Sequence, residues 1–117
     1  MKEQLIARSK AFAIAIIQMT ESLPRRNATY IISNQIVKSS SSIGANYRAA
    51  LRGRSKAEFI AKLGIVEEEA DETLYWLEIL REGGIASKEI IDPLWKECNE
   101  LLSIFIATIK TTKSNRT

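Results

Sequence analysis

The sequence of 117 residues contains no histidine, and this absence excludes more chemistry than any single residue indicates. Without an imidazole there is no histidine general base, no Ser-His pair, and no Glu-x-x-His ligand set of the kind that holds di-iron centres in helical bundles. The sequence also lacks a glycine-rich phosphate loop and a spaced calcium loop. We therefore expect a protein that is not an enzyme and that has no cofactor or metal. A distant alternative is an enzyme with a carboxylate site at Glu69 and Glu72.

Cysteine and long apolar runs are equally scarce. Cys98 is the single cysteine, so no intrachain disulfide can form, and its apolar helical position predicts a small core residue. No apolar run approaches the ~20 residues that a bilayer span requires, and the first segment has charges inside its apolar pattern and no small-residue cleavage site. We expect a cytoplasmic protein without a membrane segment. Its length and its 45% apolar and 26% charged residues are typical of one globular domain over residues 1–117.

What the sequence does contain is helical periodicity. Apolar or small residues recur at alternating spacings of four and three in four separate segments, which is the period of one face of a helix. With the flanking proline, glycine and serine signals, the stripes predict helices over about residues 3–23, 28–52, 55–82 and 87–112. Helices joined by turns of about three or four residues must run antiparallel to their neighbours. The prediction is therefore an all-α fold, an antiparallel up-down-up-down four-helix bundle.

Several residues mark the predicted helix ends. The segment from Ser55 to Glu58 has the form of a capping box, which begins the third helix. Asn27 is predicted to cap the second helix, and Gly53 to end it in a left-handed conformation. Pro93 leaves two alternatives: it kinks the first turns of the fourth helix, or Asp92 is the real cap and Pro93 the first helical residue.

The second predicted helix contains a run of four serines, Ser39 to Ser42. Taken alone, such a run suggests a flexible linker. However, Ile36 and Ile43 stay in phase across it, which favours a continuous helix whose small residues let a neighbouring helix approach closely.

Charge is distributed unevenly along the chain. Residues 27–56 carry five basic and no acidic side chains, whereas residues 57–86 carry eight acidic and two basic ones. In one interpretation the two helices only complement each other at the surface, where each exposed pair contributes at most ~1 kcal/mol. In the other, a basic surface binds the phosphates of RNA or DNA. We expect Tyr30 and Tyr47 to be packed, so binding would recognise the backbone, through Arg25, Arg26, Lys38, Arg52, Arg54 and Lys56.

The third predicted helix has a second line of residues beside its core stripe. Ile65, Trp76 and Ile79 lie on this line, and a monomer would leave them exposed. Aromatic residues are enriched in protein interfaces, so these three residues are predicted to form an oligomer interface. The alternative is that a wide core buries Trp76 and Ile79.

Two carboxylates occupy the same line, Glu69 and Glu72. A partly buried carboxylate without a partner is costly, so each should have a hydrogen-bond donor nearby. Asn46, Arg48 or a hydroxyl of the serine run are the candidates. We therefore predict a structural polar cluster of Asn46, Arg48, Glu69 and Glu72.

The middle of the chain resembles a known family. The matching motifs cover most of Ser39 to Leu80 and include Ser-Ser-Ser-Ser-Ile-Gly-Ala-Asn-Tyr-Arg-Ala-Ala, Ser-Lys-Ala-Glu-Phe-Ile-Ala-Lys-Leu and Glu-Ala-Asp-Glu-Thr-Leu-Tyr-Trp-Leu. They are similar to the bacterial four-helix-bundle family that includes proteins encoded by intervening sequences in 23S ribosomal RNA genes. The likeness extends over nearly the whole chain and is looser in the first and last helices.

The resemblance implies a homopentamer arranged as a short barrel with a central opening. The chain is also similar to the accessory variability determinant protein of diversity-generating retroelements, which partners a reverse transcriptase and binds nucleic acid. Many relatives carry a glutamate just after the position of Arg48, where this chain has Ala49 and Ala50. Two functions follow: an oligomeric module that binds RNA or DNA, or a scaffold that docks a larger enzyme such as a reverse transcriptase.

Overall fold

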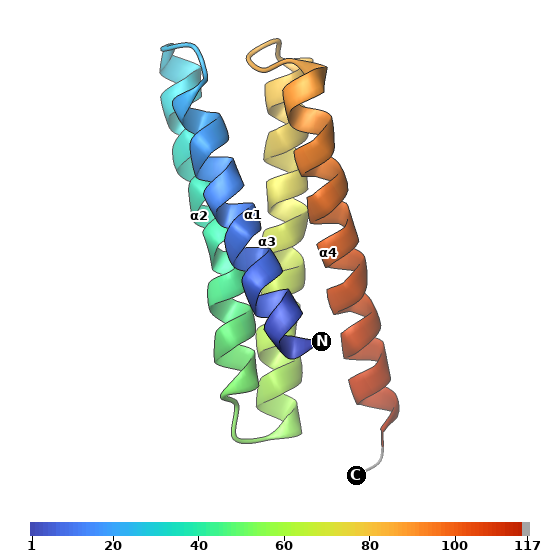
Figure 1. Ribbon diagram of the computed structural model, residues 1–117. Coiled ribbons are helices and arrows are strands. Elements are labelled where there is room, and N and C mark those ends of the chain that lie inside the picture. The colour runs from blue at the N-terminus through green and yellow to red at the C-terminus, as the bar shows by residue number, and fades with distance from the viewer. Residues whose placement is uncertain (116–117) are drawn as a thin grey trace.

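The computed structural model describes residues 1–115, which form four helices: α1 (Lys2–Glu21), α2 (Asn27–Leu51), α3 (Lys56–Glu82) and α4 (Lys88–Ser114). Figure 1 shows the helices side by side, with the α1–α2 and α3–α4 turns at one end and the α2–α3 turn at the other. The bundle measures 51 × 20 × 20 Å. Each helix packs on its neighbours in the chain, and α1 also packs on α4 to close the bundle. The predicted antiparallel four-helix bundle is confirmed.

The core consists of the predicted apolar stripes. Ile16, Ile36, Leu63, Leu77 and Phe105 are inaccessible to solvent and come from all four helices. Burying a side chain of this kind stabilises the fold by roughly 1.5–3 kcal/mol. None of the helices in the described part combines the length and the hydropathy that a bilayer crossing requires.

The serine run lies inside α2, so the linker interpretation is wrong. Ser39 and Ser40 are fully buried, and the hydroxyls of Ser39 and Thr73 share a hydrogen bond of 2.8 Å between α2 and α3. On the side facing α1, a Cβ atom at Gly44 would lie 3.1 Å from Ser9 Oγ. Small residues therefore let α2 approach both of its neighbours closely, as the sequence predicted.

The capping box at the start of α3 is present in altered form. Ser55 Oγ accepts a hydrogen bond from the Glu58 N–H at 3.1 Å, as predicted. The Glu58 carboxylate reaches back to the N–H of Arg54 at 2.6 Å instead of that of Ser55. The turn before α3 is thus held by both side chains of the motif.

The start of α4 decides between the two alternatives for Pro93. Ser87 Oγ accepts a hydrogen bond from the Ile90 N–H at 3.4 Å, and the helix begins at Lys88. Pro93 therefore lies inside α4, and Asp92 is not its cap. Asp92 instead accepts a hydrogen bond from Arg81 at 2.8 Å.

Both predictions for the ends of α2 are wrong. Arg26 has the extended backbone of a cap residue (φ −133°, ψ 158°), so Asn27 is already helical and cannot act as the cap. Among residues 1–115, no side chain accepts a hydrogen bond from the first turn of α2. At the other end the helix stops at Arg52 with φ −95°, and within the described residues only Gly84 has a positive φ, of 71°. Gly53 therefore does not adopt the left-handed conformation.

Candidate nucleic-acid interface

One face of α2 points away from the core along its whole length. Its residues recur at spacings of three and four, and every one of them is exposed. We call this set the α2 outer face: Tyr30, Asn34, Lys38, Ser41, Ala45, Arg48 and Arg52. Because no acidic residue lies between 27 and 56, α2 and its C-cap residue Arg52 contribute three cations to this face and no carboxylate.

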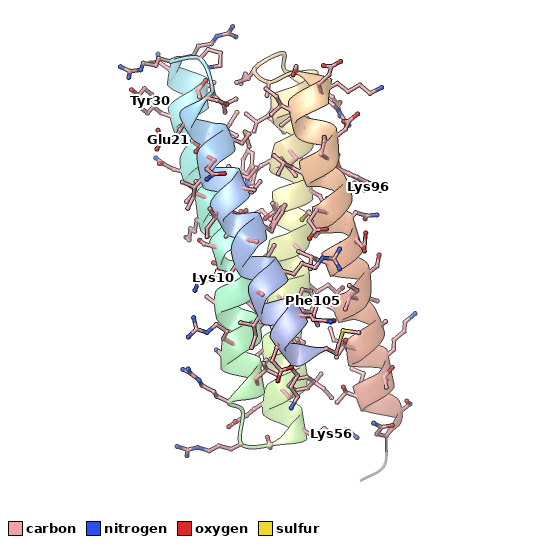
Figure 2. All side chains as sticks on the ribbon, in the orientation of Figure 1. Lys10, Glu21, Tyr30, Lys56, Lys96 and Phe105 are labelled. Carbon is pink, nitrogen blue, oxygen red and sulfur yellow. The ribbon has the colours of Figure 1, made fainter. Side chains whose placement is uncertain are left out.

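The six residues predicted to bind nucleic acid are all exposed, but the structure does not bring them into one cluster. Arg25 and Arg26 lie in the α1–α2 turn, Lys38 lies midway along α2, and the other three lie at the α2–α3 turn. The 25 residues of α2 separate the two turns by roughly 37 Å. Figure 2 shows Tyr30 near one end of the molecule and Lys56 near the other.

The six residues also differ in what they already contact. In the part of the chain that the structure describes, ion pairs form at Arg8 and Arg81 and at none of the six. Lys56 Nζ donates a hydrogen bond to the carbonyl oxygen of Asn115. Most of the predicted interface thus presents cations that no carboxylate neutralises.

The predicted polar cluster of Asn46, Arg48, Glu69 and Glu72 does not form. Arg48 is exposed on the α2 outer face, and Asn46 donates to the carbonyl oxygen of Ser42 at 2.9 Å. Glu72 accepts a hydrogen bond from Trp76 Nε1 at 3.2 Å.

The reason is the register of the two antiparallel helices. The Ser39–Thr73 hydrogen bond shows that these two residues lie opposite each other. Because the helices are antiparallel, nine residues further along α2 correspond to nine residues back along α3, so Arg48 lies opposite Gly64. At 1.5 Å per residue, Glu69 then lies roughly 7 Å further along the axis. Arg48 consequently belongs with the other cations of the outer face.

The pKa of Glu69 is shifted even though Arg48 does not contact its carboxylate. Partial burial raises the pKa of its carboxyl, and the negative charges of Glu72 and Glu68 add to the increase. The positive charge of Lys38 opposes it and lowers the pKa. Lys38 is therefore the cation of α2 that interacts electrostatically with Glu69 on α3.

The three residues predicted to form an oligomer interface differ in exposure. Ile65 is 39% exposed, whereas Trp76 and Ile79 are half-buried and pack against the core. Tyr75, beside Trp76, is 55% exposed. The predicted interface on α3 therefore includes exposed apolar surface at Ile65, whereas Trp76 and Ile79 are partly covered by the core.

Two grooves flank α2. A groove of about 680 Å³, which we call the α1–α2 groove, runs along the end where these helices join and includes Ile17, Arg25 and Tyr30 in its lining. A second groove of about 390 Å³ lies at the α2–α3 end and is lined by Arg52, Arg54 and other residues. Basic residues thus border a groove at each end of α2.

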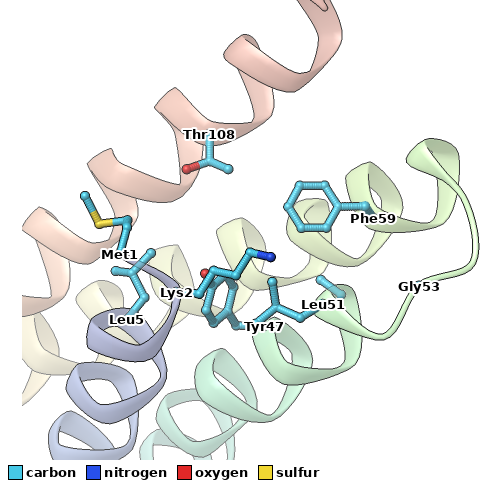
Figure 3. A pocket seen from close by; sticks show the side chains of 9 residues that line it. Met1, Lys2, Leu5, Tyr47, Leu51, Gly53, Phe59 and Thr108 are labelled. Atoms are coloured by element: carbon cyan, nitrogen blue, oxygen red, sulfur yellow. The ribbon is translucent and has the colours of Figure 1, made fainter. Parts of the chain in front are cut away.

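A third hollow, of about 370 Å³, opens at the α2–α3 end of the bundle. Figure 3 shows the side chains of Leu5, Tyr47 and Phe59, from three helices, around it. Tyr47 is buried as predicted, and its ring packs against Phe105 with centroids 5.2 Å apart. Burial, and then the charge of Glu3, raises the pKa of Tyr47. The described residues that line this hollow include no carboxylate.

The described residues contain no grouping of three or more metal-binding side chains. Cys98 is fully buried, and its Sγ donates a hydrogen bond to the carbonyl oxygen of Ala70 at 3.4 Å. Burial raises the pKa of Cys98 to about 12, so its thiol stays protonated at neutral pH. The prediction of a core cysteine is confirmed.

Sequence reasoning missed two features. Tyr30 is 64% exposed, contrary to the expectation that it is packed, although its place four residues before Asn34 and eight before Lys38 would have assigned it to the outer face. Arg8 of α1 donates two hydrogen bonds of 2.7 Å to Glu97 of α4. No local pattern predicts that pair, because its members are 89 residues apart.

Comparison with known proteins places the fold in a family. A solved structure of a protein of unknown function from the S23 ribosomal protein family of Bacteroides thetaiotaomicron is 35% identical, with a TM-score of 0.85. The match covers 91% of this chain and 98% of that one. No curated protein matches the sequence. The family model of the 23S rRNA-intervening sequence proteins matches residues 2–107, and the chain therefore belongs to that family.

Proposed function

We propose that this protein is a non-catalytic, cytoplasmic module that binds RNA or DNA through phosphates, using the α2 outer face and the turns on either side of it. The observation that carries the proposal is the set of exposed cations, Lys38 and Arg48 on α2 and Arg52 directly after it, on a segment without any carboxylate. Arg25, Arg26, Arg54 and Lys56 extend the same positive surface beyond both ends of the helix.

Phosphate binding suits this arrangement better than neutralisation by α3. A cation that already has a carboxylate partner must lose it before it binds a phosphate, and Arg8 and Arg81 are in that position. The cations of α2 have no such partner among residues 1–115. Phosphate contacts carry no sequence information, so we expect little sequence preference.

Self-association would multiply the few contacts that one chain can make. We propose a homo-oligomer, and on the family resemblance a pentamer, in which the interface includes Ile65, Trp76 and Ile79. Copies of the α2 outer face on one assembly could engage a strand together and raise the apparent affinity by orders of magnitude. Light scattering at micromolar concentration tests this, and a monomer of 13.1 kDa would contradict it.

A second candidate is a scaffold that docks a larger protein, such as a reverse transcriptase. Exposed apolar side chains support it, notably Tyr75 at 55% and Ile65 at 39% exposure on α3. In this case the positive charge would set the orientation and rate of encounter.

The decisive experiment is a binding titration with RNA and DNA of mixed sequence between low and physiological salt. The test variant replaces Arg25, Arg26, Arg52 and Arg54 with glutamine. The control replaces four exposed lysines of α4 with glutamine and so removes the same amount of charge: Lys88, Lys96, Lys110 and Lys113.

We expect the logarithm of the affinity to fall steeply with salt for the wild type and less steeply for the test variant. The α4 control should stay close to the wild type. Equal losses in the two variants would mean that only net charge matters, and absence of binding at low salt would leave the scaffold as the better candidate.

A further inference from the structure

The α1–α2 groove differs from the other hollows because it has an exposed aromatic ring at its edge. Tyr30 is 64% exposed and lines the groove together with Arg25 and Lys38. Lys38 lies two turns further along α2, roughly 12 Å from Tyr30. Figure 2 shows Tyr30 and Glu21 near the end of the bundle where α1 joins α2. An aromatic face between two cations is the arrangement by which proteins hold unpaired bases and the phosphates that connect them.

The start of α2 adds free hydrogen-bond donors to the same place. No side chain of the described residues accepts a hydrogen bond from the first turn of α2, whereas Ser55 and Ser87 cap α3 and α4. Uncapped N–H groups and the positive end of the helix dipole together favour an anion. Arg25 and Arg26 immediately precede this turn, so a phosphate here would meet backbone N–H groups and guanidinium groups at once.

The lining of the groove contains an unsatisfied polar group as well. Thr29 is 7% exposed, and its Oγ1 is buried without a hydrogen-bond partner, the one such side-chain atom in the described residues. Leaving a buried hydroxyl unpaired costs free energy that a bound polar group can recover. This observation is independent of the charge of the turn, and it too indicates a ligand in the α1–α2 groove.

We propose that the α1–α2 groove binds single-stranded RNA or DNA, with a base stacked on Tyr30 and an adjacent phosphate at the start of α2 beside Arg25. The inference rests on the proposed function and names its substrate class. In a duplex the bases are already stacked on one another and paired, so an exposed tyrosine ring has no free base face to cover.

Glu21 is the one carboxylate among the described residues that line the groove, and its position indicates how a bound strand would be oriented. A carboxylate repels phosphate, but it accepts a hydrogen bond from the exocyclic amino group of a base such as cytosine. The bases rather than the phosphates would therefore face α1, while the phosphates follow Arg25 and Lys38 along α2.

The experiment measures the affinity of the full chain for a fluorescent single-stranded oligonucleotide of mixed sequence and for the duplex of the same sequence. The variants are Tyr30→Ala, which removes the ring, and Tyr30→Phe, which retains it. Ile90→Ala is the control, because Ile90 is an exposed apolar residue of α4 that has no part in the proposed surfaces.

We expect Tyr30→Ala to weaken single-strand binding about tenfold and to leave duplex binding unchanged. Tyr30→Phe and Ile90→Ala should bind as the wild type does. The salt dependence of Tyr30→Ala should equal that of the wild type, because no charge is lost. A photocrosslink from 5-iodouracil in the single strand should map to Tyr30.

Other outcomes separate this inference from the function on which it rests. If the wild type binds and Tyr30→Ala binds single strands equally well, the stacking site is wrong and phosphate binding stands. If Tyr30→Ala weakens duplex and single strands alike, the residue acts on the fold or the surface and the inference is also overturned. If the wild type binds neither at low salt, both proposals fail.

Discussion

The two turns that flank α2 carry similar positive charge and differ in what their hydrogen-bonding groups already contact. At the α2–α3 turn, Ser55 and Glu58 accept from backbone N–H groups, and Lys56 donates to Asn115. At the α1–α2 turn, Arg25 and Arg26 precede an uncapped helix and border a groove with an exposed tyrosine. The number of positive charges alone therefore does not determine the capacity to bind. A turn whose donors are occupied by its own chain offers an anion less than a turn whose donors are free.

The largest expected effect comes from removing the charges of one turn at a time. We expect Arg25→Gln with Arg26→Gln to lower the affinity for single strands about tenfold or more and to reduce the salt slope by about two. Arg52→Gln with Arg54→Gln should lower it only about threefold, because fewer contacts depend on that turn. Titrations at two salt concentrations measure both effects. Equal losses would remove the distinction between the turns.

The next effect concerns stability. Ser55→Ala removes the cap of α3 and should lower the free energy of unfolding by about 1 kcal/mol. Asn27→Ala should leave it nearly unchanged, because the side chain of Asn27 caps nothing. Chemical denaturation followed by circular dichroism compares the two variants. A loss at Asn27 as large as that at Ser55 would show that α2 is capped in solution.

A cap can also be added where none exists. Arg26 has cap geometry, so Arg26→Ser should give α2 an acceptor and stabilise the fold by about 0.5–1 kcal/mol. The same change removes a cation and occupies a backbone donor, so nucleic-acid binding should weaken. The free energy of unfolding of this variant, measured by denaturation, should therefore rise, while its affinity for nucleic acid, measured by titration, should fall. If binding survives intact, the free donors of α2 are not part of the site.

The smallest effect is expected from opening the other turn. Glu58→Gln keeps the shape of the side chain, removes a negative charge and weakens the hydrogen bond from the N–H of Arg54. We expect affinity to rise about twofold, since one more basic turn becomes available to phosphate. The free energy of unfolding should fall by about 0.5 kcal/mol with the weaker capping box. No gain in affinity would mean that the α2–α3 turn is remote from the bound strand.

The sequence predicted the fold almost completely because the fold depends on repeated local signals. The apolar stripes run through Ile16, Ile36 and Phe105 as the periodicity required, and Ser55 begins α3 as its motif required. Arg48 was misassigned because its neighbours depend on the register between α2 and α3. That register depends on the contact of Ser39 with Thr73, 34 residues away. The apolar pattern of one helix does not show which residues of another helix lie opposite it.

Errors at the candidate site have the same origin. Tyr30 was expected to be packed, yet its angular position on α2 opposes that of Ile32 and Ile36. The missing cap of α2 depends on the backbone angles of Arg26, which composition does not determine. The sequence predicted which segments are basic. Only the three-dimensional structure distinguished the turn whose backbone N–H groups already have side-chain acceptors from the turn whose N–H groups have none among residues 1–115.

The ion pair of Arg8 with Glu97 has a consequence for the order in which the chain folds. The three turns join helices that follow one another, so those contacts close short loops and form early. The seam between α1 and α4 joins the two ends of the chain and is the least extensive of the four helix contacts. We expect the α1–α4 seam to form last during folding and to open first in hydrogen exchange, by a local opening that leaves the contacts between consecutive helices packed. Since both charges of the pair are about one-third exposed, added salt should make that opening more frequent.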